Sequence, residues 1–269
     1  MHGRSAFHLP LANELLSQAR ARAERSGLNL FGLVSASRFD SCQPCDRRVQ
    51  SLRDGCGTIV VLGTGGRAFW SAYVQSRSGA VQGTQAAADA DRYAQRSARE
   101  LGEWLVDQGI AATTVLPGAS RGVRFQCLAE AAGLGVVSPV TGQLLHPTYG
   151  PWMSVRAVLL LDGEPFGPID NASIAHEFQP CCGCPRPCVS ACAPHAYDGN
   201  GKQDLDKCAP HRDAGNCGEG CNTRLACPLG AEHRDAPDEF AHRHGQTLAV
   251  LRRLAGLGLW SLVPKGLRS

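Results

Sequence analysis

Long apolar runs are missing from this sequence. No stretch approaches the roughly 20 apolar residues of a membrane-spanning helix, and the N-terminal stretch through Gly27 has no apolar core of a secretory signal. We therefore predict no membrane partner and a cytoplasmic location. Disulfides are rare in that compartment, so they are not the expected use of the cysteines in this chain.

A strong excess of one charge is also missing. The chain has 27 Lys and Arg against 24 Asp and Glu, a net charge of +3 and a pI near 8.3. A polyanion-binding domain usually shows a basic stripe and a higher pI. The cationic stretch Arg20–Arg25 alternates with Ala and Glu and predicts a solvated helix face. The turn Thr64–Arg67 lacks the spacing of a phosphate-binding loop and predicts a plain tight turn.

Cysteine, in contrast, is abundant and concentrated in one stretch. Nine of the 13 cysteines lie between Cys181 and Cys227, in two runs. The first run reads Cys181-x2-Cys184-x3-Cys188-x3-Cys192, with Cys182 as an extra thiol. The second run reads Cys208-x8-Cys217-x3-Cys221-x5-Cys227 and closes on Pro228.

Two such runs are typical of the ligands of two 4Fe–4S clusters. Short spacers let neighbouring thiolates reach three irons of one cube, and in two-cluster ferredoxins the fourth cysteine of each run crosses to the other cluster. Zinc is an alternative because His195 and His211 lie close enough to serve, although so many cysteines overfill one or even two zinc sites. The predicted metal ligands are Cys181, Cys184, Cys188, Cys192, Cys208, Cys217, Cys221 and Cys227. The spacing leaves open whether Cys181 or Cys182 is the ligand.

Helices and strands alternate in the first part of the chain. Apolar residues recur at helical spacing over residues 11–26, 86–108 and 125–132, and apolar runs of strand length cover 28–35, 58–63, 110–116 and 154–161. This alternation predicts an α/β domain over residues 1–165. The cysteine-rich domain is expected over 166–235. The last segment, 236–269, contains a helix with one apolar face that is expected to pack on the first domain.

Several motifs stand in a recognisable order. Ala132-Gly133-Leu134-Gly135 is followed by His146-Pro147-x-x-Gly150-x-Trp152, by Arg156 leading a hydrophobic strand, and by the double cysteine block. This order resembles that of the epoxyqueuosine reductases and, more distantly, of the reductive dehalogenases. The segment 146–161 is also similar to the strand region of the cobalamin-processing protein family of methylmalonic aciduria and homocystinuria type C.

The resemblance implies a fold and a chemistry. The fold is α/β (α+β), a nitroreductase-like sandwich that places cobalamin beside a C-terminal two-cluster ferredoxin-like domain. The activity is that of an iron–sulfur reductase. Electrons from a low-potential donor of the ferredoxin or flavodoxin type would pass through two 4Fe–4S clusters to the corrinoid and to a small or nucleoside-like substrate. The candidates for the corrin pocket are His146, Tyr149, Gly150, Pro151 and Trp152. The plainer interpretations are that His146 is a turn histidine and that Trp152 is a buried core residue.

One departure from the family pattern bears on catalysis. In epoxyqueuosine reductases an Asp upstream of the Ala-Gly-Leu-Gly segment is the proton donor, whereas residues 119–122 here contain no carboxylate. Ser120 and Arg121 are therefore the catalytic candidates in that stretch. The departure also favours a second function, a cobalamin-binding or cobalamin-reducing processing protein without an organic substrate. A third is an electron-transfer ferredoxin fused to an α/β domain that could hold flavin, and tRNA stays open as a partner.

Overall fold

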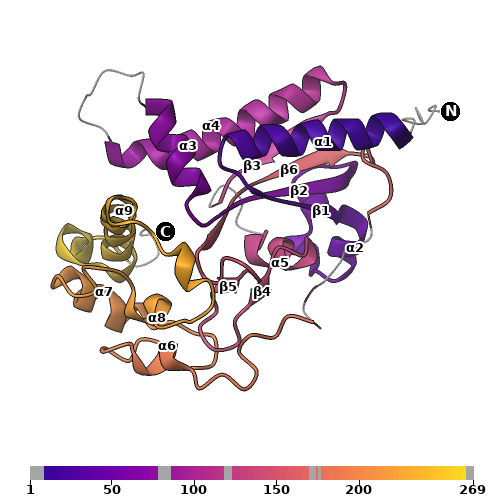
Figure 1. Ribbon diagram of the computed structural model, residues 1–269. Helices are drawn as coiled ribbons and strands as arrows, with labels where there is room; N and C mark the ends of the chain where they lie inside the picture. The colour runs from indigo at the N-terminus through magenta and orange to yellow at the C-terminus, as the bar shows by residue number, and fades with distance from the viewer. Residues whose placement is uncertain (1–8, 78–85, 118–122, 170–173, 175–176, 265–269) are drawn as a thin grey trace. The chain divides into compact units, whose positions relative to one another are not determined.

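The computed structural model describes the whole chain except residues 1–8, 78–85, 118–122, 170–173, 175–176 and 265–269 (Figure 1). The chain divides into two compact units. Unit 1 comprises Met1–Val81, Ala90–Val136 and Ser154–Glu177, and unit 2 comprises Gln82–Asp89, Val137–Met153 and Phe178–Ser269. No helix in the described part of the chain is both long enough and apolar enough to cross a membrane.

Unit 1 is built on a four-stranded sheet. Its strands are β1 (Leu30–Ser35), β2 (Cys56–Gly65), β6 (Met153–Asp162) and β3 (Ala112–Val115), in the order β1-β2-β6-β3. β1 pairs antiparallel with β2, and β3 pairs antiparallel with β6. Gly57 lies against Gly163 while Gly63 lies against Ser154, so β2 and β6 also run in opposite directions. The four predicted strands are confirmed, and together they form an antiparallel sheet.

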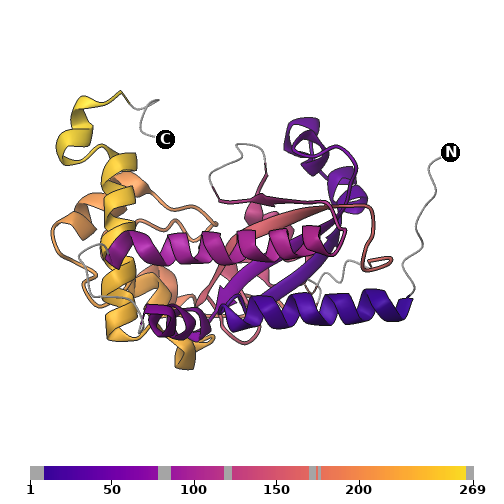
Figure 2. The same ribbon diagram turned by 90° about the horizontal axis from the view of Figure 1, so that it is seen from above.

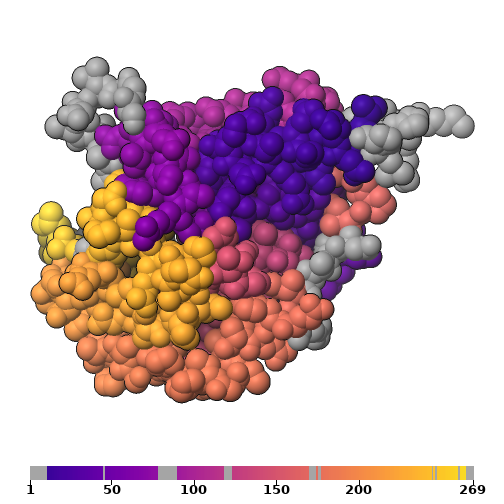
Figure 3. Space-filling model, viewed as in Figure 1, coloured from indigo at the N-terminus to yellow at the C-terminus, as the bar shows by residue number. Residues whose placement is uncertain are grey.

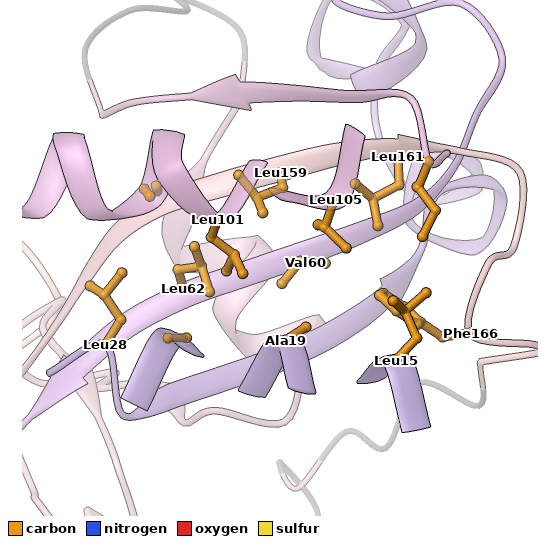
Figure 4. Packing of buried hydrophobic residues seen from close by; sticks show 14 residues of the cluster. Leu15, Ala19, Leu28, Val60, Leu62, Leu101, Leu105, Leu159, Leu161 and Phe166 are labelled. Carbon is orange, nitrogen blue, oxygen red and sulfur yellow. The ribbon is translucent and has the colours of Figure 1, made fainter. Parts of the chain in front are cut away.

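Two long helices cover one face of this sheet. They are α1 (Leu9–Arg25) and α4 (Ala86–Asp107), which lie side by side over the strands (Figures 1 and 2). Leu101 and Leu105 of α4 meet Val60 and Leu62 of β2 in a cluster of buried apolar side chains (Figure 4). The cluster forms because the apolar residues of both helices recur every three or four positions and so share one face.

A shorter helix, α5 (Phe125–Ala131), lies on the other face of the sheet (Figure 1). Its close approach depends on Gly32 of β1, where an added Cβ would lie 2.6 Å from the Cβ of Ala132. The Ala132–Gly135 motif therefore has a packing role in unit 1. Beside the sheet lie the remaining elements of this unit, α2 (Ala36–Ser41), η1 (Cys45–Arg47), η2 (Val49–Ser51) and α3 (Ala68–Arg77).

Unit 2 consists mainly of short helices. A hairpin of β4 (Val136–Val137) and β5 (Leu144–Leu145) comes first, and the tail ends in η3 (Ala231–His233), α9 (Pro237–Ala255) and η4 (Gly258–Leu262). The cysteine block between them folds into α6 (Pro187–Ser190), α7 (Leu205–Asp213) and α8 (Asn222–Leu225). α6 packs against α8 and α7 against α9. The orange atoms of the cysteine block form one continuous patch of surface in Figure 3.

The units divide the chain differently from the expected boundaries at several places, two of which involve contacts with the cysteine block. Residues 137–153 were expected in the first domain but group with unit 2, because Gly150 packs backbone to backbone against Leu229. Residues 236–269 also group with unit 2, where Arg252 of α9 pairs with Asp213 of α7 at 2.5 Å. Packing of this tail on the first domain stays a prediction.

Candidate metal centre

Four cysteine thiols line a cavity of about 270 Å³ within unit 2. They are Cys192, Cys208, Cys217 and Cys221, one from the end of the first run and three from the second. We call this space the large thiol cavity. Cys217 reaches it from a left-handed backbone conformation (φ 58°), which a non-glycine residue adopts only at a cost of about 1–2 kcal/mol.

The other four predicted ligands line a smaller cavity of about 50 Å³ in the same unit, which we call the small thiol cavity. They are Cys181, Cys184 and Cys188 of the first run and Cys227 of the second. Cys181 also lies 3.4 Å from the hydroxyl of Ser138. Cys182 is exposed and does not contribute to the lining of either cavity. The structure thus brings Cys181, and not Cys182, to the other thiols.

The last cysteine of each run lines the cavity of the other run, and a short helix links it to the preceding cysteine. Cys188 of α6 lines the small cavity, and Cys192, just beyond that helix, lines the large one. Cys221 precedes α8 and lines the large cavity, and Cys227, just beyond that helix, lines the small one. Each run therefore gives three thiols to one cavity and one thiol to the other.

Burial raises the pKa of several of these thiols. The pKa of Cys188 is raised by desolvation and then by the neighbouring Cys227, Cys181 and Cys184. Desolvation raises the pKa of Cys208, although a hydrogen bond that Gln203 donates to its Sγ at 3.3 Å acts in the opposite direction. Burial therefore favours the protonated form of the Cys188 and Cys208 thiols in the metal-free chain, and a bound metal would have to displace those protons.

Two buried polar atoms at the cavities lack a hydrogen-bond partner among the described residues. One is the indole Nε1 of Trp152, which lines the large cavity, and the other is the hydroxyl of Thr223, which lines both. A buried donor without a partner is uncommon in native proteins. In the described part of the chain, no three His, Cys, Asp or Glu side chains converge as one bound metal ion requires; the thiols of each set line a cavity instead.

The predicted corrin-pocket residues lie in a turn that contacts the cysteine block. His146 and Gly150 exchange backbone hydrogen bonds of 2.9 and 2.8 Å, and the Nδ1 of His146 accepts the N–H groups of Thr148 and Tyr149. The pKa of His146 is lowered by desolvation and then by His233. This geometry is that of a neutral turn histidine.

Gly150 has no room for a side chain. Its φ is +54°, and an added Cβ would lie 2.0 Å from the carbonyl oxygen of Leu229. The opposing Gly230, with φ +65°, is equally tight against Tyr149. The two glycines therefore hold the 146–152 turn against the segment that follows Cys227.

Arg224 of α8 joins the same turn to the large cavity. Its guanidinium lies 4.2 Å above the ring of Trp152, and its Nε donates to the carbonyl of Pro151 at 3.0 Å. Both Arg224 and Trp152 line the large cavity, and Trp152 is 5% exposed. Contact of this turn with a corrinoid stays a prediction; its observed partners belong to the cysteine block.

A buried ion network was not foreseen from the sequence. Asp235 lies 3.5 Å from Arg224 and 3.9 Å from Arg243, and Arg243 pairs with the fully buried Glu239 at 2.6 Å. Burial lowers the pKa of Arg224 and raises that of Glu239. The i,i+4 spacing of Glu239 and Arg243 was the one available signal for this pair.

The remaining predicted positions lie elsewhere. Ser120 and Arg121 lie outside the described residues. Arg156 belongs to unit 1, where its Nη1 is 3.1 Å from Oδ1 of Asp91 and its guanidinium lies 4.9 Å over the ring of Phe69. Cys56 is buried at the start of β2, and desolvation raises its pKa to about 11, as expected for an unreactive structural thiol.

No protein-family model matches the chain, and no curated protein matches it in sequence. Solved structures do match. An epoxyqueuosine reductase with an epoxyqueuosine-modified tRNA stem loop has a TM-score of 0.58 at 16% identity, over 92% of this chain and 82% of that one. The epoxyqueuosine reductase of Bacillus subtilis has a TM-score of 0.58 at 17% identity, over 84% and 68%.

A more distant likeness is to a catabolic reductive dehalogenase in complex with 3-bromo-4-hydroxybenzoic acid. Its TM-score is 0.50 at 17% identity, over 95% of this chain but only 43% of that one. At these identities the likeness concerns the fold. The mixed α/β architecture with a small antiparallel sheet is that of the epoxyqueuosine reductases, and the resemblance predicted from the motifs is confirmed at that level.

Proposed function

We propose that this chain is an iron–sulfur oxidoreductase of the epoxyqueuosine reductase type. It would hold two 4Fe–4S clusters in unit 2 and pass electrons from a ferredoxin- or flavodoxin-type donor to a corrinoid and a small or nucleoside-like substrate. The tRNA stem loop bound by one structural neighbour makes a nucleoside within RNA the first substrate to test.

One observation carries the proposal. Eight thiols from two runs separate into two sets of four, and each set combines three thiols of one run with one thiol of the other. Two-cluster ferredoxins distribute their ligands in this crossed manner. The unpartnered indole N–H and threonine hydroxyl at the cavities also suit a group rich in sulfur acceptors.

Each residue set has a defined role in this proposal. Cys192, Cys208, Cys217 and Cys221 would hold one cluster, and Cys181, Cys184, Cys188 and Cys227 the other. When bound, the clusters supply one-electron transfer, and the corrinoid supplies a strongly nucleophilic reduced cobalt. The surrounding protein excludes water and sets the potentials through hydrogen bonds and burial.

Anaerobic reconstitution of the full chain with iron and sulfide tests the cluster assignment. The wild-type chain should bind about eight irons and eight sulfides, as two cubes require. Cys227→Ala should lose one cluster and fall to about four irons, because the small cavity then has three thiols. Cys182→Ala is the matched control and should retain both clusters, since Cys182 is exposed.

Two results would contradict this assignment. One is a colourless wild-type chain that binds zinc in place of iron, and the other is an equal loss of iron in Cys182→Ala and Cys227→Ala. The corrinoid is tested separately by adding hydroxocobalamin to the reconstituted chain. A shift of its visible spectrum on reduction is expected, and the corrinoid part of the proposal fails if no corrin is retained.

A sequence observation favours a second candidate function. Residues 119–122 contain no carboxylate where the resembling reductases carry their proton donor. A cobalamin-reducing processing protein would need no such acid. Rapid reduction of bound cobalamin with no turnover of an epoxyqueuosine-containing stem loop would favour this candidate, whereas turnover would favour the reductase.

A further inference from the structure

The two thiol cavities differ in the charge around them. The charged side chains that line the large cavity are four arginines and two acids: Arg212, Arg224, Arg234, Arg243, Glu219 and Asp235. Four positive and two negative charges leave a formal balance of +2, and the buried Glu239, which pairs with Arg243 at 2.6 Å without lining the cavity, lowers it to +1. No Asp, Glu, Lys or Arg among the described residues lines the small cavity, which is enclosed chiefly by proline, leucine, threonine and cysteine.

The hydrogen-bond donors at the two cavities differ in kind: the small cavity has hydroxyl groups, such as that of Ser138 at 3.4 Å from Cys181, and the large cavity also has an indole and arginines. Trp152 lines the large cavity, and its buried Nε1 has no partner among the described residues. Arg224 lies over the Trp152 ring at 4.2 Å, donates to the Pro151 carbonyl at 3.0 Å and pairs with Asp235 at 3.5 Å, and these contacts hold its guanidinium at the cavity wall. Neither Trp152 nor Arg224 lines the small cavity.

We propose that Arg224 and Trp152 act as tuning residues that give the large-cavity cluster the higher reduction potential of the two. A cluster gains one negative charge when it takes up an electron from the ferredoxin- or flavodoxin-type donor, with no bond broken and no proton transferred. A fixed cation and an N–H donor stabilise that more negative form, and net charge and hydrogen bonds to sulfur are established determinants of cluster potential. An electron shared by the pair would then reside mainly on the large-cavity cluster.

This inference rests on the proposed clusters and assigns new roles to two residues. Trp152 was expected to form part of a corrin pocket, and Arg224 had no predicted role. The structure places both at one thiol cavity. Neither side chain is a predicted ligand, so its removal should change a potential while leaving the iron content unchanged.

Redox titration followed by electron paramagnetic resonance on the reconstituted full chain tests the inference. Arg224→Gln should lower one midpoint so that the reduced-to-oxidised ratio at a fixed potential falls about tenfold, which is about 59 mV for a one-electron couple. Trp152→Phe should shift the same midpoint in the same direction by less, since it keeps the ring under Arg224. Arg224→Lys should restore much of the loss because it retains the charge.

The control is Arg252→Gln, which removes an exposed arginine of the same unit; Arg252 pairs with Asp213, and neither residue lines either cavity. Neither midpoint should move in this variant. The Cys227→Ala chain assigns the midpoints, because only the large-cavity cluster remains in it; the inference requires that this be the higher of the two wild-type values.

The inference is overturned if both Trp152→Phe and Arg224→Gln load fully and keep wild-type midpoints. It is equally overturned if Cys227→Ala retains the lower midpoint. Should Arg224→Gln fail to fold because Asp235 loses a partner, the conservative Trp152→Phe variant decides. A wild-type chain that binds no iron would instead refute the proposed function, so the two failures are distinguishable.

Discussion

The interiors of the two units differ in the kinds of side chain that fill them. Unit 1 has a continuous apolar core in which leucine, valine and alanine side chains of α1, α4, β2 and β6 are almost fully buried. Unit 2 has a small apolar cluster around Ala196 and Tyr197, and elsewhere its interior mixes separate apolar side chains such as Leu145 with thiols, arginines and buried acids. Its helices in the cysteine block are four to nine residues long.

This difference indicates how each unit is stabilised. Burial of apolar surface at roughly 25 cal/mol per Å² can maintain unit 1 without help from a ligand. Helices of four residues are unstable on their own, and their stability must come from tertiary contacts. We infer that unit 2 depends on the proposed clusters as an internal crosslink, in the way that small metal-binding domains depend on their metal.

Removal of the clusters should have the largest effect and should be confined to unit 2. Chelation of iron under anaerobic, reducing conditions should bring the amides of residues 178–235 close to unprotected exchange. The amides of β2 and β6 should keep their protection because their core contains no thiol ligand. Hydrogen exchange with mass spectrometry measures both regions in one experiment. Unchanged protection of 178–235 after complete loss of iron would break the comparison.

A cavity created by mutation in the apolar core should have the opposite effect: it should destabilise unit 1 and leave the proposed clusters of unit 2 unchanged. Leu159→Ala removes a fully buried side chain from the sheet core and should lower the free energy of unfolding of unit 1 by about 2–5 kcal/mol. The iron content and the spectrum of the clusters should stay as in the wild type. Denaturant unfolding provides the measurement. Leu11→Ala on the same unit is the control, because Leu11 is 63% exposed and should change stability by less than about 0.5 kcal/mol.

The tight glycine contact in unit 2 allows a smaller and more local test. Gly150→Ala places a Cβ against the Leu229 carbonyl at a positive φ, so it should lower stability by more than about 2 kcal/mol, of which about 1–2 kcal/mol is backbone strain. Gly245→Ala lies in α9 with open space around it and should instead raise stability by about 1 kcal/mol. Thermal unfolding of the two reconstituted variants gives the comparison. Equal changes in stability of the same sign in both variants would contradict the tight contact between Gly150 and Leu229.

Most of unit 1 could be predicted from the sequence, because its elements are long and periodic. The helices at 11–26 and 86–108 and the four strands were found within a few residues of their observed bounds. The helix α3 was missed after the Gly65–Gly66 turn, although Phe69 and Tyr73 lie four residues apart on its buried face. The cationic stretch of α1 is less free than expected, since Arg20 and Arg22 stack on Phe31 and Trp104 at 5.1 and 4.6 Å.

The candidate site could be predicted in part. Cysteine spacing predicted the eight ligands, and the crossing expected of two-cluster ferredoxins matches the way in which the eight cysteines divide between the two cavities. Cys181 and Cys182 are adjacent in the sequence, so the choice between them depends on which of the two side chains faces the cavity. Cysteine spacing does not contain that information. The pairing of Arg224 with Trp152 joins residues 72 positions apart, a separation that local patterns do not report.

The short helices α6 and α8 have a consequence for electron transfer. At a rise of 1.5 Å per residue, a four-residue helix is about 6 Å long, and each of these two helices takes the chain from one cavity to the other. The interval between the proposed centres is therefore set by covalent backbone geometry over a few residues. One residue inserted in either helix would alter that interval.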